Sequence, residues 1–172
     1  LDNRLTLNTA VYQTDWANIP VIYFDTTDEC DGSISNNQGE AQSKGVELDL
    51  SYLVTEALRV DLAMAYNESE FTEVSDDSGL KVGEELAYAP HSTASLGVEY
   101  SFDISSYPAF VRTDISYFGE AKPFHDDFGD GLATVGDYTN IGFRIGVNID
   151  QWSLAVYGNN LLNNDDTTVY VA

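Results

Sequence analysis

The feature that most constrains this chain is a strict alternation of apolar and polar residues, repeated in short runs. Six strong runs of this kind cover residues 46–54, 58–66, 94–102, 109–117, 141–149 and 152–157. A weaker run covers residues 5–12. Successive side chains of a β-strand point to opposite faces of a sheet, so a period of two predicts strands and does not fit a helix. The sequence therefore predicts an all-β, antiparallel protein of about seven to eight strands.

The charged residues inside these runs obey the same alternation. All eight of them take polar positions: Glu47, Asp49, Arg59, Asp61, Glu99, Arg112, Asp114 and Arg144. One face of the predicted sheet is therefore free of charge. Such a face meets either lipid, as in a transmembrane barrel, or the core of a soluble antiparallel sandwich.

The connections between the runs are alternately short and long. Short turns are predicted at residues 55–57, 104–106 and 150–151, and long polar segments at 17–42, 73–88 and 120–136, with a shorter one near 163–167. Outer-membrane barrels have the same asymmetry, with short periplasmic turns and long extracellular loops. Aromatic residues gather near the ends of the runs, which is typical of the belts at a membrane interface. These are Tyr12, Trp16, Tyr52, Tyr66, Tyr100, Phe102, Tyr107, Tyr117, Phe118, Tyr138 and Trp152. Together, the loops and the aromatic residues favour a membrane barrel over a sandwich.

Composition argues against several other classes of protein. The formal net charge is −22, from 7 Lys and Arg against 29 Asp and Glu, which argues against a nucleic-acid partner. No stretch approaches the roughly 20 apolar residues of a transmembrane helix. Cys30 is the single cysteine, so it forms no internal disulfide. Because His91 and His125 lie far apart without metal-ligand spacing, we expect no metal site and no cofactor.

Three stretches, in order, resemble elements of TonB-dependent outer-membrane receptors. Residues 36–48, which include Gly39-Glu40-Ala41 and Gly45-Val46-Glu47, resemble the segment where an extracellular loop re-enters the barrel. Residues 86–91, Leu-Ala-Tyr-Ala-Pro-His, resemble the element that precedes a barrel strand. Residues 152–162, from Trp152 to Leu162, resemble the penultimate strand with its Asn-Leu-Leu ending. The resemblance extends from about Arg4 to Tyr170.

The resemblance implies a location in the bacterial outer membrane and a 22-stranded barrel around a plugged lumen. It implies contact with outer-membrane lipid, and uptake of a scarce small-molecule cargo, such as a ferric siderophore, with energy relayed by TonB. The chain shows no plug domain, no TonB-contacting segment and no final strand ending in an aromatic residue. We therefore expect residues 1–172 to be a partial C-terminal barrel of a longer protein, which meets TonB through the missing plug region.

The resemblance also suggests roles for two sets of residues. The eight polar-face charges would point into the lumen, where they pair with each other or a plug, or contribute to the cargo path. Acidic stretches in the predicted extracellular loops are a second set, as solvated charge or as ligands of divalent cations. This second set is Asp25, Asp28, Glu29, Asp31, His125, Asp126, Asp127 and Asp130.

The sequence leaves three alternatives to a receptor segment. Residues 125–127, His-Asp-Asp, are superficially similar to outer-membrane proteases, but adjacent residues in one loop do not give opposed acid–base groups, so we predict no enzyme. A stand-alone eight-stranded outer-membrane barrel fits the length but lacks a closing strand. A soluble all-β binding domain would stay monomeric in water without detergent.

Overall fold

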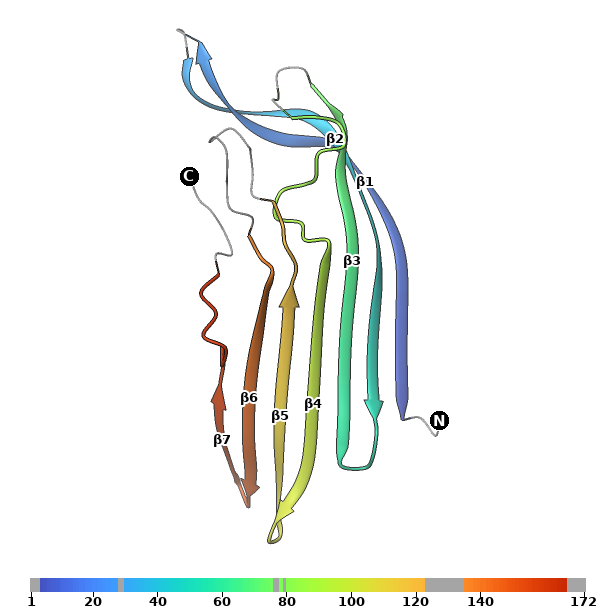
Figure 1. The fold of residues 1–172 in the computed structure, drawn as a ribbon, viewed down its shortest axis with the longest axis vertical. Helices are drawn as coiled ribbons and strands as arrows, with labels where there is room; N and C mark the ends of the chain where they lie inside the picture. Colours follow the sequence, from blue (N-terminus) through green and yellow to red (C-terminus); the bar gives the residue numbers. More distant parts are fainter. Residues whose placement is uncertain (1–3, 28–29, 76–77, 79, 123–134, 167–172) are drawn as a thin grey trace.

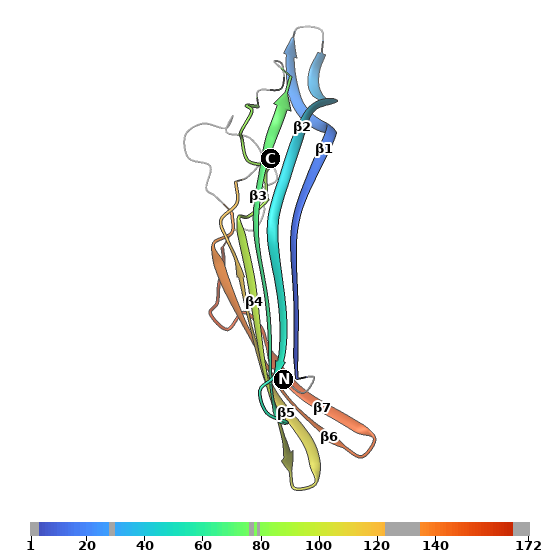
Figure 2. The same ribbon diagram turned by 90° about the vertical axis from the view of Figure 1, so that its right-hand side faces the viewer.

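The computed structural model describes residues 4–27, 30–75, 78, 80–122 and 135–166, with the backbone alone for those between 21 and 38. Seven strands form one antiparallel sheet in chain order: β1 (Leu5–Thr27), β2 (Cys30–Leu53), β3 (Leu58–Val74), β4 (Ser92–Ile104), β5 (Tyr107–Phe118), β6 (Tyr138–Ile149) and β7 (Trp152–Gly158). They make a single curved layer (Figures 1 and 2). The described residues contain no helix with the length and hydropathy needed to cross a membrane.

The predicted short turns all join neighbouring strands at one end of the sheet (Figure 1). Ser105 and Asp150 begin two-residue turns with φ of 61° and 51°, the positive values that hairpin turns matching the strand twist require. In the third turn, the Thr55 hydroxyl accepts hydrogen bonds from the backbone N–H of Ala57 and Leu58, at 3.2 and 2.9 Å. These compact turns set the registers of the hairpins that they close.

Strand registers place all eight predicted polar-face charges on one face of the sheet. Arg59 lies opposite Glu99, Glu99 opposite Arg112, and Arg112 opposite Arg144. Residues directly opposite each other in an antiparallel pair share a face, so the alternation read from the sequence is continuous across the strands.

The other face is apolar and uncovered within the described residues. Val11 is 85% exposed and Val156 71% exposed, although both lie within strands. Buried apolar residues in this part of the chain are few: Ile19, Ala41, Phe71, Ala109, Ala121 and Val135. A soluble sandwich would cover this face with a second sheet, and the described part of the chain has only one.

The prediction of a loop over residues 17–42 was wrong. β1 and β2 continue through this segment as a ladder that ends with Thr27 opposite Cys30. Residues 21–24, Val-Ile-Tyr-Phe, are strong β-formers, and a two-stranded ladder needs only backbone hydrogen bonds to extend beyond the sheet. The hairpin bends near Asn18, which has φ of 58° and lies within the first of two successive register shifts. Its outer part turns sharply away from the strand direction (Figure 1).

Candidate functional site on the polar face of the sheet

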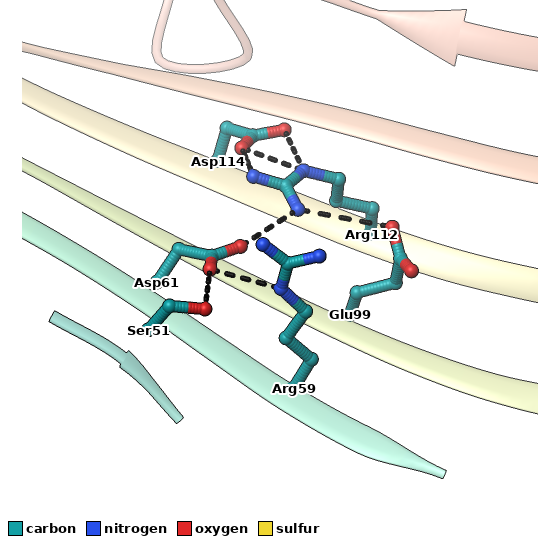
Figure 3. A network of polar contacts seen from close by, with 6 residues as sticks. All are labelled: Ser51, Arg59, Asp61, Glu99, Arg112 and Asp114. Atoms are coloured by element: carbon teal, nitrogen blue, oxygen red, sulfur yellow. Dashed lines mark hydrogen bonds and ion pairs between the residues drawn. The ribbon is translucent and has the colours of Figure 1, made fainter. Parts of the chain in front are cut away.

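The centre of the polar face is Arg112 on β5, which contacts carboxylates from three strands (Figure 3). Its Nε donates to both carboxylate oxygens of Asp114, at 2.9 and 3.1 Å, and its Nη2 lies 2.7 Å from Asp114 Oδ1. Its Nη1 lies 3.3 Å from Asp61 on β3 and 3.7 Å from Glu99 on β4. The fork of the guanidinium is thus occupied on both sides, which links β3, β4 and β5.

Asp61 is the second centre of the network. Its Oδ1 accepts hydrogen bonds from Arg59 Nε at 2.9 Å and from the Ser51 hydroxyl at 2.8 Å, while Oδ2 faces Arg112. The network therefore extends to β2 and holds two guanidinium groups among three carboxylates, a local charge of −1. A connected set of this kind is tolerated on a wet or protein-filled face and is costly against hydrocarbon.

Gly97 on β4 provides the space for this network. It lies between Asp61 and Asp114 in register, and a Cβ there would be 2.3 Å from Arg112 Nη2. The guanidinium therefore lies directly over the Gly97 backbone. A glycine within a predicted strand was the signal that could have revealed this close approach.

The three remaining predicted charges lie on the same face outside the network. Asp49 lines a shallow hollow of about 320 Å³ together with Asp61, Arg112 and Asp114. The Arg144 guanidinium lies 5.7 Å from the centre of the Phe110 ring, a cation–π contact. Among the described residues, neither Glu47 nor Arg144 makes an ion pair. That these groups face a lumen stays a prediction at this point.

A second polar cluster, which sequence reasoning missed, lies nearer the β1–β2 bend. Asn67 Oδ1 accepts hydrogen bonds from the Tyr12 and Ser43 hydroxyls, at 3.0 and 2.7 Å. Gly45 lies beneath the Tyr12 ring, since a Cβ there would be 2.6 Å from the Tyr12 hydroxyl oxygen. Tyr12 thus belongs to the polar face and not to an aromatic belt at the lipid.

Registers divide the predicted belt residues between the two faces. Trp16, Phe118 and Tyr138 join Tyr12 on the polar face, and Phe118 stacks on Tyr138 with centroids 5.7 Å apart. The apolar face keeps the others: Tyr52, Tyr66, Tyr100, Phe102, Tyr107, Tyr117 and Trp152. The belt prediction was therefore wrong for the four aromatic residues on the polar face, because residue type alone does not reveal to which face of a strand a side chain belongs.

The central part of the apolar face forms a continuous apolar band, which ends sharply toward the long connections. Lys44 and Glu68 form an ion pair of 3.4 Å on this face, and the Tyr66 hydroxyl donates to Glu68 at 3.0 Å. That hydrogen bond, followed by the Lys44 ammonium, lowers the pKa of Glu68, which lies beyond the apolar residues. From Leu58 to Tyr66 the band is nine residues long, close to the 9–11 residues with which a tilted strand crosses a bilayer.

A small hydrophobic cluster lies beyond the band, at the end with the long connections. Ile19, Ala41 and Phe71 are buried, and Val74, Leu80 and Leu86 pack against them. This cluster joins the bent hairpin to the outer part of β3 and the connection that follows it. Isolated apolar residues within polar segments were its only signal in the sequence.

Of the predicted extracellular acidic residues, the structure describes only the backbone of two. Asp28, Glu29, His125, Asp126, Asp127 and Asp130 lie outside the described residues. Asp25 and Asp31 are strand residues of the β1–β2 ladder, opposite Gly32 and Thr26, so placing them in a loop was wrong. Within the described residues, no group of three or more His, Cys, Asp and Glu side chains could hold a metal ion.

A single antiparallel meander in which one face carries a charge-free apolar band and the other a charged network has the form of a segment of a transmembrane β-barrel wall. Known proteins agree with this class. The chain belongs to the TonB dependent receptor-like β-barrel family, whose sequence pattern matches residues 1–161. The resemblance seen in the sequence, and the all-β fold, are thereby confirmed.

Solved structures of similar fold include an uptake receptor, a siderophore receptor and a copper transporter. The ferric yersiniabactin uptake receptor FyuA from Yersinia pestis matches with a TM-score of 0.72 and 20% identity, over 99% of this chain and 24% of that one. The siderophore receptor PiuA from Acinetobacter baumannii has a TM-score of 0.66 and 21% identity, over 98% and 23%. The copper transporter OprC has a TM-score of 0.66 and 15% identity, over 96% and 24%. The present chain thus spans about a quarter of the length of these structures.

Proposed function

We propose that this chain is part of the barrel wall of a bacterial outer-membrane receptor that imports a scarce nutrient, such as a ferric siderophore, with energy relayed by TonB. The observation that carries the proposal is that one face of the sheet carries a charge-free apolar band while the other carries the Arg112 charge network. Family membership and the solved structures support the same reading. The whole receptor would consist of this segment, further barrel strands and a plug domain that contacts TonB.

Energetics orient the two faces. An arginine that faces lipid at the bilayer midplane of a barrel costs about 2–4 kcal/mol, so Arg112 and the three carboxylates that it contacts belong on the interior. The exposed apolar residues, among them Met64, Ile145 and Val156, then face lipid. The two-residue turns after β4 and β6 lie on the periplasmic side, and the long β1–β2 hairpin lies outside the cell.

In this orientation the chain forms part of the barrel wall and of the extracellular opening, and it catalyses no reaction. The Arg112 network would hold the strands together and face whatever fills the lumen, while Asp49, Glu47 and Arg144 would be free to contact a plug or passing cargo. The family is one of transport receptors, and we propose no catalytic residue in this chain.

An iron chelate is the cargo class that we favour. Two of the similar structures named above are receptors for ferric yersiniabactin and for siderophores. Copper is a second candidate, because a copper transporter has a similar fold. The long β1–β2 hairpin would stand at the entrance in either case.

Uptake by the source bacterium tests the proposal directly. Deletion of the complete gene is expected to reduce uptake of radioactive iron, supplied with the siderophores of the bacterium's own spent medium, as much as deletion of TonB does. Unchanged iron uptake together with reduced copper uptake would favour the second candidate. If neither metal is affected, or if the protein is absent from the outer-membrane fraction, the proposal fails.

The size of the native protein provides a separate test of the domain proposal. Intact mass spectrometry of the membrane fraction, anchored on peptides of this chain, should give a mass several times 18.9 kDa with additional peptides upstream. A native mass equal to that of these 172 residues would contradict it.

A further inference from the structure

Two connections at the outer end of the sheet are joined by one carboxylate, that of Glu85. Glu85 belongs to the connection between β3 and β4, and its Oε1 lies 3.3 Å from His91 Nε2 in the same connection. Its other oxygen lies 3.4 Å from Lys122 Nζ, in the connection that follows β5. We call Glu85, His91 and Lys122 the rim latch.

Backbone contacts hold the two connections close enough for the latch to form. The Tyr88 N–H donates to the Lys122 carbonyl at 2.7 Å, and the Gly119 N–H donates to the Ser92 carbonyl at 2.9 Å. Ala121 forms an isolated β-bridge with Val135, and both residues are buried. The backbone on the N-terminal side of Lys122 is therefore held in place, which keeps Lys122 within reach of the Glu85 carboxylate.

The His91 ring is held so that its two nitrogens face two acceptors. Nδ1 lies 3.1 Å from the Asn67 carbonyl oxygen, and the ring stacks on Tyr66 with centroids 6.3 Å apart and planes at 24°. The Asn67 N–H in turn donates to the His91 carbonyl at 2.9 Å. Because a carbonyl and a carboxylate only accept hydrogen bonds, a neutral imidazole with one N–H can satisfy either acceptor but not both.

We propose that the rim latch is proton-operated: protonation of His91 closes it, by giving the ring the second N–H and the positive charge that Glu85 requires. The neutral ring that donates to Asn67 turns a lone pair toward the Glu85 carboxylate, which weakens the contact. A histidine is the side chain that makes this change in the mildly acidic range. The latch is independent of the proposed cargo uptake, since it rests on contacts within this chain.

Other charged and titratable groups around His91 come from every neighbouring element. Tyr66 on β3 stacks on the His91 ring, Glu68 on β3 interacts with it electrostatically, and Lys44 on β2 pairs with Glu68. Tyr117 on β5 interacts with Ser92, which follows His91, and with Glu120, while Tyr88 belongs to the same connection as His91. Glu68 is engaged by Lys44 and Tyr66, and Lys122 interacts with Glu85 at every pH at which both are charged. The proposal therefore assigns the change in the latch to His91, whose ring faces both Glu85 and the Asn67 carbonyl.

Hydrogen exchange of the complete receptor in detergent, followed by mass spectrometry, tests the latch. Exchange of peptides covering residues 84–91 and 117–122 is compared at about pH 5.5 and pH 8, after correction for intrinsic rates. We expect protection of these peptides to be about two- to fivefold higher at the lower pH, the range of a half-exposed ion pair. The variant His91→Gln should abolish this pH dependence, with His125→Gln as the matched control that keeps it.

Two further variants separate the two halves of the latch. Lys122→Met should lower protection at both pH values while the pH dependence remains, and Lys81→Met in the same β3–β4 connection should change neither. Glu85→Gln should lower protection at both pH values and also abolish its pH dependence. Equal protection at the two pH values in the unmodified receptor would overturn the proposal. So would pH dependence that survives in His91→Gln or disappears in His125→Gln.

Discussion

Removal of the Arg112 side chain is the sharpest test of the charged network. Arg112→Met leaves Asp61, Glu99 and Asp114 without their shared cation, while the methionine keeps most of the side-chain volume. The Arg112 side chain is 28% exposed, so each contact is intermediate between a surface pair and a buried one. The bidentate contact with Asp114 contributes about 1 kcal/mol, and those with Asp61 and Glu99 together a similar amount. We therefore expect a loss of about 2 kcal/mol in unfolding free energy.

Arg144→Met is the matched control, because Arg144 lies directly opposite Arg112 on the same face. It makes no ion pair among the described residues, and its contact with Phe110 contributes about 0.5–1 kcal/mol. The assay is guanidinium chloride unfolding of the complete receptor in lipid vesicles, followed by tryptophan fluorescence. A double-mutant cycle with Asp61→Asn isolates the contact between Arg112 and Asp61. Equal losses for the two arginine variants, or zero coupling to Asp61, would refute the reasoning.

Three further changes test other parts of the sheet. Gly97→Val should lower the unfolding free energy by about 1–3 kcal/mol, because the valine side chain would collide with the Arg112 guanidinium. Most of this loss should vanish in an Arg112→Met background, and chemical unfolding measures both variants. Met64→Arg on the apolar face should cost about 2–4 kcal/mol in vesicles, whereas Ala63→Arg on the polar face should cost less, so equal costs would argue against the assignment of faces. Phe71→Ala removes a buried ring from the outer hydrophobic cluster and should cost up to about 3–5 kcal/mol locally. It should therefore speed proteolysis of the β1–β2 hairpin without dissociating the barrel, and an unchanged cleavage rate would contradict it.

Local patterns in the chain were sufficient for the strands and for the division into faces. Alternation is a property of the extended backbone, so the placement of Asp61 and Arg112 on one face follows from counting residues within each strand. Register in the β4–β5 hairpin also follows from local information, because the two-residue turn at Ser105 places Glu99 opposite Arg112. The outer part of β1–β2 was missed because its polar residues hid a run of strong β-formers at residues 21–24.

Contacts between distant strands were decided only by the tertiary structure. A long connection separates β3 from β4, so no turn specifies that Asp61 lies opposite Gly97 and within reach of Arg112; a shift of two residues would keep every face and change every partner. The rim latch depends in the same way on two connections that meet in space, with Glu85 and Lys122 far apart in the chain. The sequence by itself determined the strands of the apolar band, the face of each charge and the family, because these depend on local periodicity and motifs. The partners of each charge required the assembled sheet, because they depend on register between segments that no short turn connects.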